Sequence, residues 1–137
     1  MTAPTSGRQS HHPQGLFDAA RYGFAQAVSV PAGRLVFVSG QVAWDAQERL
    51  VASDLGGQTA AALANLGIAL GDAGAALPDV AALRIYIVGN PDDTSGISAA
   101  LRAVFPAGEG PAATWVHVGG LEGEGLLVEI EATAVVR

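Results

Sequence analysis

Five stretches of the chain alternate apolar with polar residues or are rich in β-branched residues, and both patterns predict β-strands. The turn-forming sequence Pro31-Ala32-Gly33 separates the first two stretches, so we expect them to pair as a hairpin. The five predicted strands are residues 24–30, 34–42, 80–88, 110–120 and 125–136.

Two further segments space their apolar residues three or four apart, as a helix with one buried face requires. The first, residues 53–75, can be capped by Ser53 or Asp54. The second, near residues 93–105, follows an Asn-Pro-Asp-Asp turn. The stripe on the first helix comprises Leu55, Thr59, Ala62, Leu63, Leu66 and Leu70, and that on the second comprises Ile97, Leu101, Val104 and Phe105.

The order of these elements is β-β-α-β-α-β-β, which predicts an α+β domain with two helices on one face of a single sheet. We expect residues 16–137 to form this one domain. Residues 1–15 are rich in Ser, Thr, Pro, Gln and His and show no periodicity, so we expect a flexible tail there.

The last predicted strand carries two carboxylates. Because side chains alternate across a strand, Glu129 and Glu131 share one face, about 7 Å apart, and the apolar face from Leu126 to Ala134 should meet the helices. The carboxylate face is partly apolar and has no helix to cover it, so we expect it to meet another subunit. Glutamates buried there need partners, and Arg84 is one candidate. Two interpretations stay open: structural ion pairs, or a general base or ligand acceptor between subunits.

Composition narrows the chemistry. The chain has no cysteine, which excludes disulfides, thiolate metal sites and a cysteine nucleophile, and no lysine, which excludes Schiff-base catalysis. A net charge of −6 makes nucleic acid a poor partner. No apolar run reaches the ~20 residues of a membrane helix and no signal-peptide pattern opens the chain, so we expect a cytoplasmic protein without membrane contact. His117 is the one histidine outside the predicted tail, and we expect neither metal nor cofactor.

Several stretches, taken in order, resemble the reactive-intermediate deaminase family, also called RidA or YjgF. They are QAVSV, LVFVSGQV, QTAAALANLGIALGDAGAALPDV, GPAATWV and LVEIEATAVV, and they run from about Tyr22 to Val136. The resemblance implies a chorismate-mutase-like α+β fold and a homotrimer whose sheets form a central barrel. It also implies small-molecule sites in clefts between subunits, where 2-imino or 2-enamino acids are hydrolysed to 2-keto acids and ammonia.

The functional residues of this family match the chain in part. Glu129 matches the glutamate that positions the attacking water, and Ser39 and Gly40 match a Ser-Gly pair that lines the cleft. The family's Pro-Ala-Arg motif, whose arginine grips the substrate carboxylate, is Pro-Ala-Ala here and ends at Ala113. Phe24 stands where the family has a tyrosine. The missing bidentate contact predicts weak capture of 2-imino acids.

Strand alternation places Ala113, Trp115 and His117 on one face, and in the family position 113 points into the cleft. The expected cleft holds an indole, an imidazole and the Glu129 carboxylate, without a cation. We therefore expect a hydrolase in which Glu129 and His117 act on a neutral imine-like or carbonyl-like compound that stacks on Trp115. The alternative is a trimeric small-molecule-binding or regulatory protein without catalysis. Ribonuclease activity, attached to some relatives, is disfavoured by the acidic charge and the absence of lysine.

Overall fold

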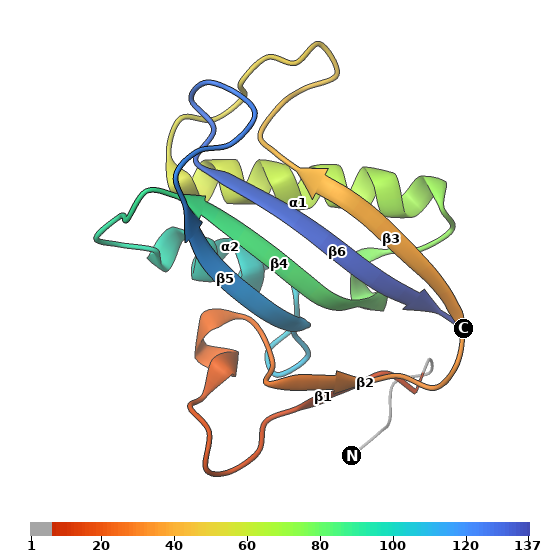
Figure 1. Cartoon of the computed structure of the whole chain (residues 1–137). Coiled ribbons are helices and arrows are strands. Elements are labelled where there is room, and N and C mark those ends of the chain that lie inside the picture. Colours follow the sequence, from red (N-terminus) through yellow and green to blue (C-terminus); the bar gives the residue numbers. More distant parts are fainter. Residues whose placement is uncertain (1–6) are drawn as a thin grey trace.

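The fold is built on one four-stranded sheet (Figure 1). The computed structural model describes residues 7–137. The strands of this sheet are β3 (Arg34–Gln41), β4 (Val80–Val88), β5 (Ala112–Val118) and β6 (Val128–Val136). Their order across the sheet is β3-β6-β4-β5; β4 and β5 are parallel, whereas β6 is antiparallel to both of its neighbours. The two edges of the sheet are therefore β3 and β5.

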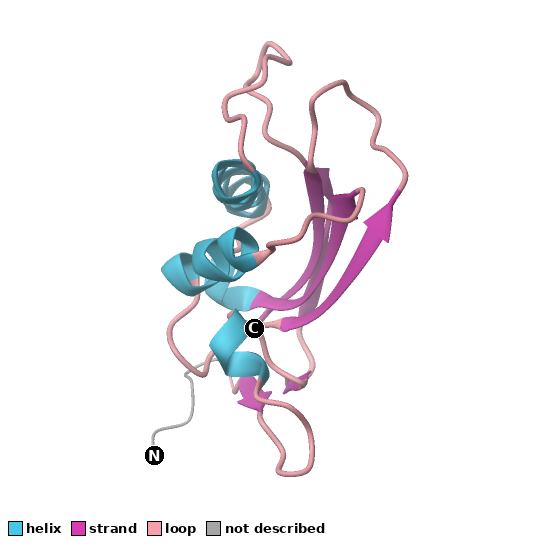
Figure 2. Ribbon diagram, turned by 90° about the vertical axis from the view of Figure 1, so that its left-hand side faces the viewer, coloured by secondary structure: helices cyan, strands magenta, loops and turns pink. Residues whose placement is uncertain are grey.

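Both predicted helices form, as α1 (Leu55–Asp72) and α2 (Ser95–Val104). They lie together on one side of the strands (Figure 2). The Asp54 carboxylate caps α1 by accepting the backbone N–H of Gly57 at 3.1 Å. Two short 3₁₀ turns, η1 (Ala19–Tyr22) and η2 (Leu77–Asp79), precede β2 and β4 in the chain, β2 being Ala27–Ser29. Within residues 7–137 no helix is both long enough and apolar enough to cross a bilayer.

The hydrophobic core fills the space between the helices and the sheet. Its most deeply buried members are Leu63, Leu66 and Leu70 of α1, Leu83, Ile85 and Ile87 of β4, Ile97 and Leu101 of α2, and Val128 and Ile130 of β6. These positions are the predicted apolar stripes and strand faces, so the predicted orientation of both helices and of the last strand is confirmed. Two members of the predicted stripes differ: Leu55, at the start of the first, is only half-buried, and Val104, near the end of the second, is exposed.

One buried polar residue, Gln58, ties α1 to the chain around the start of β6. Its side-chain nitrogen donates to the carbonyl oxygens of Ala52 (3.1 Å) and Gly125 (2.9 Å), and its oxygen accepts the N–H of Leu127 at 2.8 Å. The side-chain amide of Gln58 thus uses both its nitrogen and its oxygen, as a buried polar group requires. The segment leading into β6 is held in place by these three bonds.

The N-terminal predictions need correction. The predicted strand 24–30 shortens to β2, which pairs with β1 (Gln9–His11) in a separate two-stranded sheet, so the hairpin with β3 is wrong. The buried Arg8 explains the pairing, because its Nε donates to the Val80 carbonyl at 2.9 Å and places β1 against the domain. Part of the predicted flexible tail is therefore a strand, and the first six residues of that tail lie outside the described residues.

Candidate functional site

Glu129 lies beside an irregularity near the end of β3. The pairing of β3 with β6 shifts register between Val38 and Gln41, so Ser39 and Gly40 form a bulge. Gly40 lies against the half-buried Glu129 side chain, because a Cβ on this glycine would overlap the carboxylate. The lack of a side chain at position 40 gives Glu129 its place. One chain thus brings three of the predicted site residues together.

The Glu129 side chain also lines a pocket of about 500 Å³ between the end of β3, the loop after it and α1. The α1 residue Asn65 anchors this loop, since its side-chain nitrogen donates to the carbonyl oxygens of Val42 (2.8 Å) and Trp44 (3.0 Å). The Trp44 side chain and Glu122 are further parts of the lining. These pocket residues were not predicted from the sequence. Asn65 had a signal, because it is an amide within the run of Ala, Leu, Ile and Gly residues that follows Thr59 in α1.

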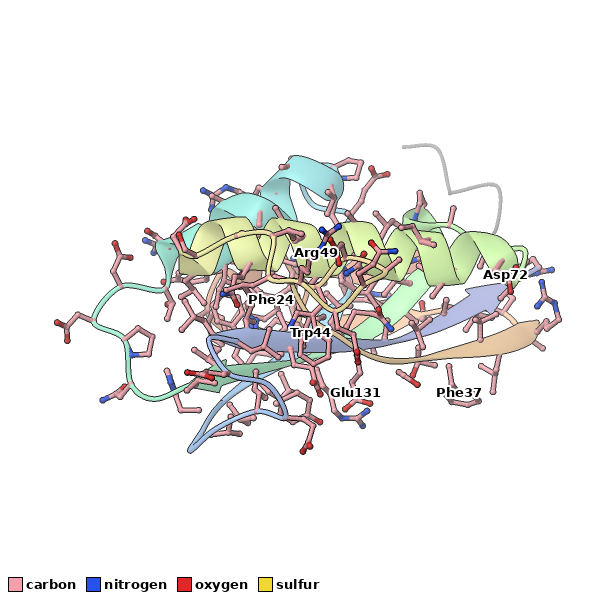
Figure 3. The ribbon with its side chains drawn as sticks, turned by 90° about the horizontal axis from the view of Figure 1, so that it is seen from above. Phe24, Phe37, Trp44, Arg49, Asp72 and Glu131 are labelled. Atoms are coloured by element: carbon pink, nitrogen blue, oxygen red, sulfur yellow. The ribbon has the colours of Figure 1, made fainter. Side chains whose placement is uncertain are left out.

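The second carboxylate, Glu131, has a different environment. It lies on the side of the sheet away from the helices, as does Phe37 (Figure 3). The Tyr86 hydroxyl donates a hydrogen bond to Glu131, and this bond is the main reason that the pKa of Tyr86 is raised. Arg84, the predicted partner, faces Glu131 in the strand register but is exposed, and no hydrogen bond or ion pair within residues 7–137 joins the two. Among the described residues, Tyr86 is therefore the hydrogen-bond partner of Glu131, in place of the candidate Arg84.

The predicted residues on β5 lie elsewhere. Ala113, Trp115 and His117 pair in register with Leu83, Ile85 and Ile87, the buried residues of β4, and therefore face the helix side of the sheet. The Trp115 ring lies 5.8 Å from the ring of Phe24, and both belong to an aromatic cluster that extends to Phe17. The Trp115 indole N–H is buried and has no hydrogen-bond partner among the described residues.

His117 is exposed at the far end of the same strand. Its Nδ1 lies 2.8 Å from the carbonyl oxygen of Gly89. A carbonyl oxygen only accepts, so Nδ1 is the donor in this bond, and a neutral ring held in this way presents Nε2 as the acceptor. This tautomer suits a group that takes up a proton.

One chain does not bring the two predicted catalytic residues together. Glu129 is on β6 and His117 on β5, with β4 between them, so about 10 Å of sheet separates their strands. The two side chains also point to opposite faces, because Glu129 pairs with Tyr86 whereas His117 pairs with Ile87. Among residues 7–137, no three histidine, cysteine, aspartate or glutamate side chains gather as a metal site would require.

The family of the chain follows from a comparison of its whole length with known families. The model of the family described as Endoribonuclease L-PSP matches residues 17–136. The chain belongs to this family. A search of curated proteins finds no match to the chain.

Solved structures agree with this membership and connect the L-PSP family to the Rid and YjgF names. A Rid family protein, YyfB, from Yersinia pestis is 37% identical with a TM-score of 0.87, and the match covers 94% of this chain and 98% of that one. Rv2704 of Mycobacterium tuberculosis, from the YjgF/YER057c/UK114 family, is 34% identical with a TM-score of 0.62 and coverages of 94% and 99%. The YjgF family protein NMB1025 of Neisseria meningitidis is 29% identical with a TM-score of 0.65 and coverages of 83% and 87%. The resemblance seen in the sequence and the α+β fold are thereby confirmed.

Proposed function

We propose that this L-PSP family protein hydrolyses small imine or enamine compounds, with Glu129 as the carboxylate that positions the attacking water. The observation that carries the proposal is the half-buried Glu129 side chain, seated against Gly40 and lining a pocket. A carboxylate placed in this way can accept a proton from water as the oxygen adds to the C=N carbon. The imine nitrogen takes up that proton, which gives a carbinolamine. It then also takes up the proton of the added hydroxyl, and the C–N bond breaks as the C=O bond forms, so an imine and water become a carbonyl compound and ammonia.

A second copy of the chain completes the site in this proposal, in a homotrimer of the kind that the RidA resemblance implies. Glu129 and the β5 residues lie on opposite faces of one chain, so a cleft that holds both needs two copies. The open face of the sheet supports association, because Phe37 is 74% exposed and Leu35 is 56% exposed there. Large exposed apolar patches are typical of interfaces. His117 of a neighbouring copy would then offer its free Nε2 as the second proton acceptor.

The substrate range is proposed to differ from that of 2-imino acid deaminases. Ala113 has no group that can grip a carboxylate, and the rings of Trp115 and Phe24 lie along the same edge of the sheet. A hydrogen bond to a charged group contributes roughly 1.5–3 kcal/mol. Its loss lowers the affinity for a carboxylate substrate by about 10- to 100-fold.

The test is ammonia release from two freshly generated imines that share one skeleton, 2-iminopropionate and 2-iminopropane, above the rate without protein. We expect the wild type to accelerate hydrolysis of 2-iminopropane more than that of 2-iminopropionate. Glu129→Gln should lower kcat/KM by about 100-fold or more, which is the usual contribution of a general base. Glu131→Gln is the matched control, because Glu131 hydrogen-bonds Tyr86 and does not line the pocket.

Full activity of Glu129→Gln would reject the proposed role of this carboxylate. If the assembled wild-type protein accelerates neither reaction, the alternative of a non-enzymatic binding or regulatory protein replaces the hydrolase. The family description also names an endoribonuclease, but a net charge of −6 and seven scattered arginines give RNA little to bind.

A further inference from the structure

The pocket beside Glu129 has an acidic and partly apolar lining. Its volume of about 500 Å³ is within the usual range for small-molecule sites. Its walls are partly apolar, with Trp44, Ile68 and Leu126 among them, and three carboxylates from separate segments belong to it. No arginine, lysine or histidine is among its lining residues within the described chain. A negatively charged ligand would find no counter-charge there.

Of the three carboxylates, only Asp45 is already paired. Its oxygens accept the side-chain Nε–H of Arg49 at 2.9 Å and the backbone N–H groups of Gln47 (2.9 Å) and Arg49 (3.0 Å). These bonds, first of all that from the Arg49 backbone, hold the pKa of Asp45 below its ordinary value. In the described part of the chain, the side chains of Glu122 and Glu129 have no hydrogen-bond or ion-pair partner. The half-buried Glu129 therefore lacks a counter-charge, which a ligand can supply.

Trp44 has contacts in this lining through both its backbone and its ring. The α1 residue Asn65 binds the Trp44 carbonyl at 3.0 Å, and the ring edge packs against Gly123, where a Cβ would overlap it. An aromatic face beside carboxylates is the arrangement that attracts organic cations, because the ring quadrupole adds to the charge attraction. Two independent features of the pocket, its charge and its aromatic wall, thus favour the same class of ligand.

We propose that this pocket binds a small organic cation, a protonated imine or amine without a carboxylate group, between Trp44 and the carboxylates of Glu122 and Glu129. The inference rests on the proposed function in one respect, since it names the substrate class that Glu129 would act on. It agrees with the alanine at position 113, where the family's Pro-Ala-Arg motif has the arginine that grips the carboxylate of an imino acid. A protonated imine carbon is also the form that water attacks most readily.

The test is calorimetric binding of three probes with the same ring, benzylammonium, benzyl alcohol and phenylacetate, to the full-length protein. We expect benzylammonium to bind at least tenfold more tightly than benzyl alcohol, and phenylacetate more weakly than both. Glu122→Gln and Glu129→Gln should each weaken benzylammonium several-fold without changing benzyl alcohol. Glu124→Gln is the control, because Glu124 is exposed on the same loop and does not line the pocket. Equal affinities for the three probes, or a preference for phenylacetate, would overturn the inference.

Fluorescence locates the bound cation, because the chain has only two tryptophans, Trp44 and Trp115. We expect benzylammonium to change the emission of Trp115→Phe, which keeps Trp44, and not that of Trp44→Phe. A change confined to Trp44→Phe would place the cation at the β5 edge and reject this pocket. Binding is measured without turnover, so the two proposals can fail separately. Cation binding without ammonia release from any imine would support the cation-binding pocket and reject the hydrolase. Glu129-dependent turnover without a preference for cations would support the hydrolase and reject the cation-binding pocket.

Discussion

The two faces of the four-stranded sheet come from the same strands, yet they differ in what covers them. On the helix side, Ile85 and Ile130 are fully buried, whereas Phe37 on the other side is 74% exposed. A strand with apolar residues on both faces normally has both faces covered. This difference shows that a single chain covers only one of the two faces of its sheet, the face against the helices. The carboxylates of Glu129 and Glu131 lie on the open face, so their chemistry depends on the partner or ligand that covers this face.

The largest expected effect comes from removing a side chain on the covered face. Ile85→Ala leaves a cavity among α1, α2 and the sheet, and should lower the free energy of unfolding by about 2–5 kcal/mol. Leu35→Ala removes a side chain of similar size that is 56% exposed on the open face, and should change it by less than about 0.5 kcal/mol. Both are measured by urea unfolding at low protein concentration, where association adds little. Equal costs for the two substitutions would show that the faces do not differ as described.

Association of the chains should depend on the open face, unlike the stability of a single chain, which depends on the covered face. Phe37→Asp places a charge on the open face of the edge strand β3, and we expect the oligomer to dissociate to folded monomers in analytical ultracentrifugation, because an unpaired buried charge is costly. The chain itself should stay folded, since Phe37 contributes little to its own core. Ile68→Asp is the control, because Ile68 is 72% exposed but lies on α1, on the other side of the sheet. A monomeric wild type, or an unchanged oligomer in Phe37→Asp, would contradict a second copy on this face.

The sequence predicted the covered face well because its signal is local. The alternation in residues 80–88 coincides with β4, and the stripe of α1 is buried almost as expected. The pairing of β2 was wrong because it depends on a contact between distant residues, the bond from Arg8 to the Val80 carbonyl. Residues 9–11 show no alternation of apolar and polar residues from which such a contact could be predicted. Local patterns determine which residues face the core, but not which neighbour a short strand chooses.

Only the site residues that lie on a predicted strand or in a motif of the family resemblance could be predicted from the sequence. Glu129, Ser39 and Gly40 are brought together as the family resemblance implies. Trp44 and Glu122 were missed because they lie in loops, where no periodicity places a side chain. The partner of Glu131 was also misjudged. Strand register places Arg84 opposite Glu131, but the hydrogen bond comes from Tyr86, two residues farther along β4 on the same face.

The smallest expected effect separates the two carboxylates of the open face. Tyr86→Phe removes the hydroxyl that donates to Glu131 and should lower the free energy of unfolding by less than Ile85→Ala does. The pKa of Tyr86 is raised in the folded chain, so this stabilisation is fully present below the ordinary tyrosine pKa of about 10 and is lost as pH rises through the folded value. In urea unfolding from pH 7 to pH 11, the difference between wild type and Tyr86→Phe should therefore stay constant and then shrink at the alkaline end. A difference in stability that grows with pH would contradict the hydrogen bond. If Tyr86→Phe loses as much ammonia release as Glu129→Gln does, both carboxylates, rather than Glu129 alone, serve the reaction.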